Sequence, residues 1–232
     1  MATFKFRYYN KLANQFIVNE YYFRRVTFEK YCKAMKELAM KLTELLAISL
    51  GVNDPLHYRE LFEEGCSIMR CNNYPCCQQP SLVLGTGPHC DPTSITLLHQ
   101  DQVGGLQVFV DNKWHTVRPL PNAIVVNIGD TFMVRIYLTP LTNALSNGRY
   151  KSCLHRAVVN KHKERRSLAF FLCPKDDKVV RPPKDIISSD GTKHYPDFTW
   201  SDLLEFTQNH YRADESTLSN FTNWLLCSKP QI

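Results

Sequence analysis

The sequence predicts an α+β protein with a mainly β core, in the order helices, strands, helices. Near the N-terminus, apolar residues recur every three or four positions, which is the spacing that lines one face of a helix. Between residues 94 and 171, short runs rich in Val, Ile, Phe and Thr are separated by Gly, Pro, Asn and Asp. Closely spaced strands with such turn residues between them favour a sandwich or a barrel.

Two helices are expected before the strands. The first is predicted over 27–50, because Thr27 can cap its start and Gly51 can end it. Asp54 and Pro55 look like a helix N-cap followed by proline at the first helical position. A second, short helix is therefore predicted over 57–64.

The rest of the chain is expected to form strands and then helices again after Pro182 and Pro183. No internal repeat or low-complexity tract interrupts this order. The predicted strands cover 106–110, 114–117, 123–128 and 168–172, and the predicted helices cover 201–211 and 214–227.

Charge and composition exclude several classes of protein. The 28 basic and 22 acidic residues give a net charge of +6 and are spread along the chain, so no nucleic-acid partner is expected. No apolar stretch approaches the roughly 20 residues that span a bilayer, and the first residues do not resemble a signal peptide. We expect a soluble, cytoplasmic monomer without membrane contact, whose nine cysteines are mostly reduced thiols.

A candidate metal site is formed by an H-x-D pair and a distant histidine. His89 and Asp91 lie two residues apart, so on an extended segment their side chains point to the same side. His155 follows 64 residues after Asp91, beyond several predicted strands. Two histidines and one carboxylate leave open coordination positions and suit Fe(II) oxygenases. Zinc hydrolases use similar ligands, so this set alone does not decide the metal.

An R-x-S pair directly before the predicted strand 168–172 narrows the choice of metal to iron. On an extended segment, residues two apart point to the same side. Arg165 and Ser167 would point the same way, and a guanidinium fork with a hydroxyl beside it matches the distal carboxylate of 2-oxoglutarate. Tyr74 could donate a further hydroxyl to that carboxylate, although a tyrosine that simply packs is nearly as well supported. His99 could face the same pocket, but a packed strand position is favoured.

With these residues in place, the chain resembles the plant 2-oxoglutarate- and Fe(II)-dependent dioxygenases. Within that family it is most similar to the gibberellin 20-oxidases, and the likeness extends from about residue 28 to the C-terminus. The segments that carry it are 84–94 (LGTGPHCDPTS), 99–109 (HQDQVGGLQVF), 147–160 (NGRYKSCLHRAVVN), 172–177 (LCPKDD) and 195–200 (YPDFTW).

The resemblance implies a double-stranded β-helix (jelly roll) flanked by N-terminal and C-terminal helices. It implies a partial N-terminal helical region over 1–64, a dioxygenase domain over 65–180 and a C-terminal helical extension over 181–232. It further implies Fe(II), 2-oxoglutarate as co-substrate, ascorbate as reductant, dioxygen, and successive oxidation of carbon 20 of a gibberellin precursor, a diterpenoid acid. The implied metal ligands are His89, Asp91 and His155, the implied 2-oxoglutarate residues are Arg165, Ser167 and Tyr74, and no further catalytic residue is implied.

Three features depart from the family pattern. The N-terminal portion that helps to wall the family's substrate cavity is absent, so we expect a partial protein. Where the family has N-Y-Y-P-P-C, this chain has N-N-Y-P-C-C, which keeps Tyr74 and changes its neighbours at 73 and 76. Residues 134–143 (VRIYLTPLTN) look like an insertion of ten residues. Pro140 and Asn143 favour a loop at a strand end over an interruption inside the strand.

Two alternatives stay open at this point. A gibberellin 3-oxidase or a flavonoid-type oxygenase would use the same chemistry on another substrate, although the stretch 100–105 (QDQVGG) argues against both. A truncated, metal-binding fragment without turnover would explain the missing cavity wall and the insertion.

Overall fold

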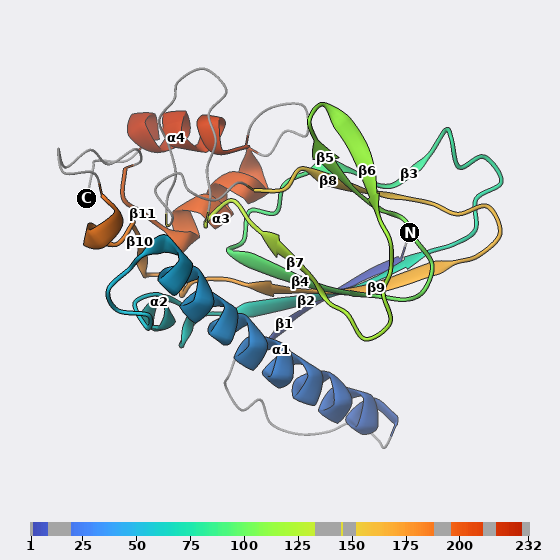
Figure 1. Ribbon diagram of the computed structural model, residues 1–232, viewed down its shortest axis with the longest axis horizontal. Coiled ribbons are helices and arrows are strands. Elements are labelled where there is room, and N and C mark those ends of the chain that lie inside the picture. Colours follow the sequence, from blue (N-terminus) through green and yellow to red (C-terminus); the bar gives the residue numbers. More distant parts are fainter. Residues whose placement is uncertain are drawn as a thin grey trace.

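The computed structural model describes residues 2–8, 20–132, 145, 152–187, 196–210 and 217–228 (Figure 1). The elements are β1 (Ala2–Tyr8), α1 (Glu20–Leu50), α2 (Arg59–Phe62), β2 (Ser67–Tyr74), β3 (Leu84–His89), β4 (Ile95–Gln100), β5 (Leu106–Val110), β6 (Lys113–Val117), β7 (Val125–Ile128), β8 (His155–Val158), β9 (Arg165–Leu172), β10 (Val179–Val180), the 3-10 helix Lys184–Ile186, β11 (Phe198–Thr199), α3 (Trp200–Asn209) and α4 (Thr217–Ser228).

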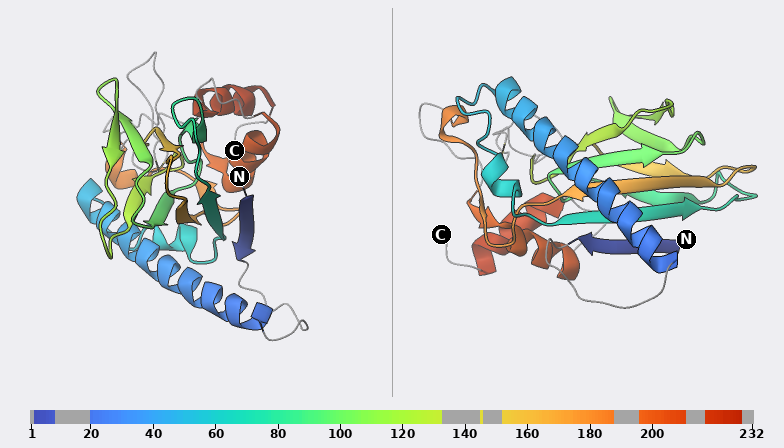
Figure 2. Two further views of the ribbon diagram at one scale, coloured as in Figure 1. Left: turned by 90° about the vertical axis from the view of Figure 1, so that its right-hand side faces the viewer. Right: turned by 90° about the horizontal axis from the view of Figure 1, so that it is seen from below.

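Two antiparallel sheets form the centre of the molecule. The larger has the strand order β1-β2-β9-β4-β7 and the smaller has the order β3-β8-β5-β6. The sheets face one another, while α1 crosses the outer face of the larger sheet and α3 and α4 gather at one end (Figures 1 and 2). The expected α+β class, with a mainly β jelly roll between flanking helices, is confirmed.

The long helix α1 is amphipathic and covers one face of the larger sheet. Its buried side chains include Cys32 and Ala39, which belong to the same apolar cluster as Met69, Leu97 and Phe170 of the sheet. The Cys32 thiol lies 3.7 Å from the Met69 sulfur. The main apolar core therefore lies between this helix and the sheet rather than between the two sheets.

The predicted end of α1 agrees with the structure, whereas its predicted start does not. The helix ends at Leu50, and Gly51 follows it with a φ of 74°, the left-handed conformation that glycine adopts most readily, so the prediction that Gly51 ends the helix is confirmed. The helix starts at Glu20, before the expected start, so the prediction that Thr27 caps it was wrong. Thr27 lies inside the helix.

The second helix is shorter than expected. α2 covers only Arg59–Phe62. The Asp54 carboxylate accepts a hydrogen bond from the backbone N–H of Leu56 at 2.9 Å, and the His57 N–H donates to the Asp54 carbonyl at 3.1 Å. Asp54 therefore stabilises a turn before the helix instead of capping the helix itself.

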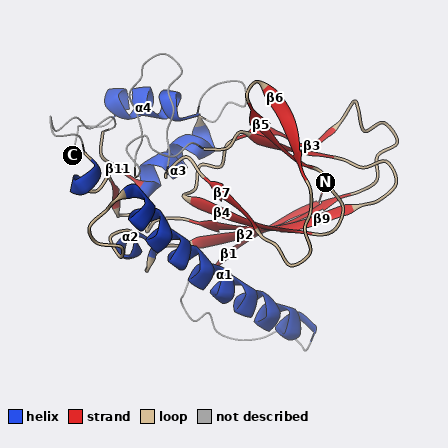
Figure 3. Ribbon diagram, viewed as in Figure 1, coloured by secondary structure: helices blue, strands red, loops and turns tan. Residues whose placement is uncertain are grey.

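The predicted strands are present in the structure, with small differences in their bounds. β5 has the predicted bounds, and β6 and β7 agree within two residues. β2 and β4 were not predicted, and β9 starts earlier than expected, at Arg165. α3 and α4 agree with the predicted tail helices within three residues (Figure 3). The insertion 134–143 lies outside the described residues.

No described helix is long and apolar enough to cross a membrane. All nine cysteines are free, in agreement with the expectation of reduced thiols.

A turn after β7 holds the segment that follows β3. The N–H groups of Gly129, Asp130 and Thr131 donate to the carbonyls of Ser94, Asp91 and Thr93 at 3.0, 2.7 and 3.3 Å. The two backbones approach so closely that a Cβ on Gly129 would lie 2.0 Å from the Thr93 carbonyl oxygen. Only glycine fits there without moving the turn.

We therefore expect Gly129→Ala to lower the free energy of unfolding by about 1–3 kcal/mol, because the added methyl group must displace backbone. Gly104→Ala is the matched control, since its Cβ would meet nothing nearer than the Pro119 ring at 3.8 Å. Urea denaturation of both variants measures the difference. Equal stability of the two variants would contradict this account of the turn.

Candidate functional site

Two histidines face each other across adjacent strands. β3 ends at His89, β8 begins at His155, and the two residues are partners in the strand register. Their rings lie 4.3 Å apart, measured between centroids. Strand pairing therefore brings together two residues that are far apart in the sequence.

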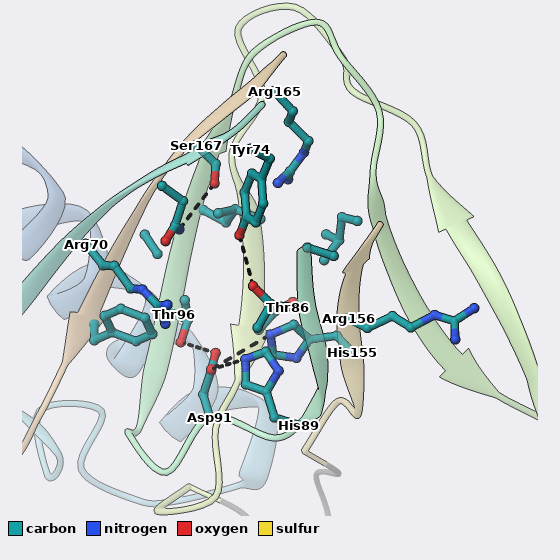
Figure 4. A pocket seen from close by; sticks show the side chains of 17 residues that line it. Arg70, Tyr74, Thr86, His89, Asp91, Thr96, His155, Arg156, Arg165 and Ser167 are labelled. Atoms are coloured by element: carbon teal, nitrogen blue, oxygen red, sulfur yellow. Dashed lines mark hydrogen bonds and ion pairs between the residues drawn. The ribbon is translucent and has the colours of Figure 1, made fainter. Parts of the chain in front are cut away.

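Asp91 completes the cluster. It follows β3 by two residues and is only 5% exposed. Its Oδ1 atom lies 3.6 Å from Nε2 of His89 and 3.8 Å from Nε2 of His155 (Figure 4). The three candidate ligand atoms all lie within 4.8 Å of one another, a spacing that could hold one metal ion.

Hydrogen bonds orient each group in this cluster. Nδ1 of His89 is 2.8 Å from the Gly87 carbonyl, and Nδ1 of His155 is 2.8 Å from the Cys153 carbonyl. Because a carbonyl only accepts, each Nδ1 must carry the proton, and each Nε2 keeps a free lone pair. Thr96 donates to Oδ2 of Asp91 at 2.6 Å, so Oδ1 remains available.

The electrostatic environment also suits metal binding. Burial lowers the pKa of His89, and the neighbouring His155 lowers it further. The His89 ring is thus neutral at neutral pH and can offer its lone pair. Two imidazoles and one carboxylate fit a divalent ion with open positions, of the kind found in Fe(II) oxygenases.

A pocket that is partly open to solvent extends from this cluster between the two sheets. Its lining combines polar and charged side chains with apolar ones. The lining residues are Arg70, Asn72, Tyr74, Thr86, His89, Asp91, Thr96, Leu98, Leu106, Asn127, His155, Arg156, Ala157, Arg165, Ser167, Ala169 and Phe171.

Arg165 lies at the other end of this pocket, away from the histidines (Figure 4). It is only 2% exposed, donates to the Gln100 side chain at 3.0 Å and lies over the Tyr74 ring at 5.1 Å. Burial lowers the pKa of Arg165, because a guanidinium loses solvation there. No described acidic side chain forms an ion pair with it. A buried, unpaired cation of this kind is suited to an anionic ligand.

Ser167 and Tyr74 lie beside Arg165. On the neighbouring strands, Ser167 pairs with Asn72 and Arg165 pairs with Tyr74 in the register of β2 and β9. The Asn72 amide donates to the Ser167 hydroxyl at 3.4 Å, which leaves the serine proton available. The Tyr74 hydroxyl is 3.2 Å from that of Thr86. The structure therefore brings all three predicted 2-oxoglutarate residues to one end of the pocket.

One prediction near the site was wrong. His99 is exposed, so it neither faces the pocket nor packs in the core. On β4 the neighbouring Leu98 and Gln100 are buried instead, and Leu98 lines the pocket.

Three residues of the site, Thr96, Gln100 and Arg70, were not predicted from the sequence. Thr96 contacts Asp91, Gln100 contacts Arg165, and Arg70 lines the pocket. The available signal was the alternation along β4, where Thr96, Leu98 and Gln100 follow one another at every second residue. It was not used because this strand was not predicted.

The model of the 2OG-Fe(II) oxygenase superfamily matches residues 65–174. Gibberellin 20 oxidase 2 from Arabidopsis thaliana is 60% identical over 205 residues, which are 88% of this chain and 51% of that protein. Gibberellin 20 oxidase 2 from Oryza sativa subsp. indica is 61% identical over 198 residues, 85% of this chain and 47% of that protein. The chain spans about half the length of these curated relatives.

A solved structure, the crystal structure of JOX2 in complex with 2OG, Fe, and JA, has the same fold. It is 35% identical with a TM-score of 0.75, and the match covers 85% of this chain and 56% of that chain. The family match, the close relatives and this structural likeness agree. Over residues 65–174, the chain carries a domain of the 2OG-Fe(II) oxygenase superfamily.

Proposed function

We propose that this chain is an Fe(II)- and 2-oxoglutarate-dependent dioxygenase that oxidises carbon 20 of gibberellin precursors. The observation that carries the proposal is the shared pocket, with His89, Asp91 and His155 at one end and buried Arg165 at the other. The identity of about 60% to two gibberellin 20-oxidases supports the substrate.

In this proposal, Nε2 of His89, Nε2 of His155 and Oδ1 of Asp91 hold the metal. When bound, Fe(II) with 2-oxoglutarate supplies the activation of dioxygen that the oxidation requires. Hydrogen bonds orient the three proposed ligands. The Gly87 and Cys153 carbonyls accept from Nδ1 of the two imidazoles, which keeps each Nε2 free for the metal. The Thr96 hydroxyl donates to Oδ2 of Asp91 and so orients the carboxylate.

Arg165, Ser167 and Tyr74 are the proposed site for the distal carboxylate of 2-oxoglutarate. The guanidinium offers a planar fork, and the two hydroxyls can donate from the side. Gln100 positions Arg165 through the hydrogen bond of 3.0 Å. Gly105 leaves room for the arginine, since a Cβ at that position would lie 2.9 Å from Cδ of Arg165.

The substrate in this proposal is a small diterpenoid acid, with dioxygen as co-substrate and ascorbate as a supporting reductant. Leu98, Leu106, Ala169 and Phe171 give the pocket apolar walls that exclude water and contact a hydrocarbon skeleton. A cytoplasmic monomer remains part of the proposal, and light scattering of the purified protein would test the monomer.

Because the chain spans about half of its curated relatives, a metal-binding fragment without turnover is the competing proposal. A gibberellin 3-oxidase or flavonoid-type activity differs only in substrate. One assay separates all of these.

Incubation of the purified chain with Fe(II), ascorbate, 2-oxoglutarate and a C20 gibberellin is expected to give oxidised gibberellin and one succinate for each oxidation step at carbon 20. Mass spectrometry measures both products, with His155→Ala as the inactive control. Succinate without oxidation at carbon 20 would contradict the proposed substrate. Neither product, together with metal binding, would identify the fragment.

His155→Ala is also expected to weaken Mn(II) binding by at least about 100-fold, because one of three ligands is lost. His99→Ala is the matched control, since His99 is exposed and lies outside the pocket. Isothermal titration calorimetry measures both affinities. The metal assignment would be wrong if the two variants bound Mn(II) equally well.

Arg165→Met is expected to weaken 2-oxoglutarate binding by about 10- to 100-fold, the effect of losing a charge-assisted hydrogen bond. Arg166→Met is the matched control, because Arg166 is the next residue on β9 and its side chain is 70% exposed. Calorimetry in the presence of Mn(II) measures the two affinities, and thermal unfolding checks that both variants fold. An unchanged affinity in Arg165→Met would overturn this role.

A further inference from the structure

We propose that Arg70 forms a second anion-binding position in the pocket, which binds a carboxylate of the organic substrate. The proposal rests on the proposed function and adds to it a residue that selects the acid form of the substrate.

Arg70 faces the same pocket as the 2-oxoglutarate residues but lies elsewhere in it. Arg70, Asn72 and Tyr74 alternate along β2, so all three side chains point to the inner face of the sheet. In the register with β9, Arg70 pairs with Ala169 whereas Tyr74 pairs with Arg165. Four residues along a strand correspond to about 13 Å. Arg70 and Arg165 are therefore placed for two different anions.

Figure 4 shows where Arg70 points. Its side chain extends from β2 towards Thr96, on the side of the pocket where Asp91 and the histidines lie, whereas Arg165 lies at the far end. A ligand group on Arg70 would thus lie on the metal side of the pocket. An organic substrate must reach this side to be oxidised.

Arg70 has an unsatisfied donor. Its Nε atom is buried and has no hydrogen-bond partner, and no ion pair joins Arg70 to an acidic side chain within the described part of the chain. A buried guanidinium N–H without an acceptor is unfavourable. A carboxylate oxygen of a ligand would satisfy it and could accept from two nitrogens of the fork at once.

Among the arginines that line the pocket, Arg70 is the one that has neither a proposed anionic ligand nor contacts that direct it away from the pocket. The three arginines that line it are Arg70, Arg156 and Arg165, and Asp91 is the single acidic residue in the described lining. Arg156 lies 4.1 Å over the Trp114 ring and donates to Gln107 at 2.8 Å. Its side chain extends away from the pocket (Figure 4).

The remaining charges cancel when the co-substrates are in place. Divalent Fe(II) and the Arg165 cation together balance Asp91 and the dianion of 2-oxoglutarate. Arg70 then keeps a positive charge without a counter-charge in the site. A monoanionic group on the substrate would neutralise it.

The surroundings of Arg70 fit a carboxylate attached to a hydrocarbon body. Leu98, Ala169 and Phe171 line the pocket on the same sheet, and Ala169 is the direct register partner of Arg70. An amphipathic acid could place its carboxylate on Arg70 and its apolar rings against these side chains. This contact would fix which carbon of the substrate faces the metal side.

The test compares a C20 gibberellin with the same compound after its carboxylates are converted to methyl esters. Binding is measured by calorimetry to protein loaded with Mn(II) and 2-oxoglutarate without dioxygen, so that no turnover occurs. We expect the wild-type chain to bind the acid about 10- to 100-fold more tightly than the ester. Arg70→Met should bind both equally, and Arg70→Lys should retain part of the preference.

Two controls separate a local effect from a general one. Arg156→Met should keep the full preference for the acid, because its guanidinium is committed to Trp114 and Gln107. Arg70→Met should keep its affinity for 2-oxoglutarate and its thermal stability.

A preference for the acid that survives in Arg70→Met would overturn the inference while the proposed function stands. Loss of 2-oxoglutarate affinity in Arg70→Met, as large as in Arg165→Met, would also overturn it, because Arg70 would then belong to the co-substrate site. If the wild-type chain bound neither acid nor ester, the proposed function itself would fail, and with it the inference.

Discussion

The pairing of β3 with β8 is the constraint on which the rest of the site depends. It places His89 opposite His155 and leaves Asp91 just beyond the strand end, where the turn at Gly129–Thr131 holds the backbone. A shift of one residue in this register would turn one imidazole to the other face of the sheet. The position of the candidate metal ligands therefore follows from strand pairing, and the hydrogen bonds to the Gly87 and Cys153 carbonyls orient the two imidazole rings within it.

Much of the fold and of the site could be predicted from the sequence, for identifiable reasons. The H-x-D pair, His155 and the R-x-S pair are recognisable because their spacing matches a strand period and their order matches a known family. The structure brings His89, Asp91 and His155 together at one end of a pocket, and Arg165, Ser167 and Tyr74 at the other. Their roles as ligands remain proposals.

The failure to predict β2 has a physical cause. β2 reads SIMRCNNY, which lacks an apolar alternation because its inward-facing residues are polar and line the pocket. A pattern that assumes an apolar interior cannot detect a strand whose inner face is polar. The positions of Arg70 in the pocket lining and of Gln100 beside Arg165 follow only from the pairing of strands, and no single segment of the sequence contains that information.

The two faces of the larger sheet contact different parts of the molecule, as pairs of neighbouring residues on β2, β4 and β9 illustrate. Met69, Leu97 and Phe170 pack in the core under α1, whereas the next residues, Arg70, Leu98 and Phe171, line the pocket. Substitutions on the inner face can therefore change which molecule is recognised without opening a cavity in the core that keeps the protein folded. Such a scaffold can acquire new substrates by single mutations, so a family built on it can diversify widely while its architecture stays the same.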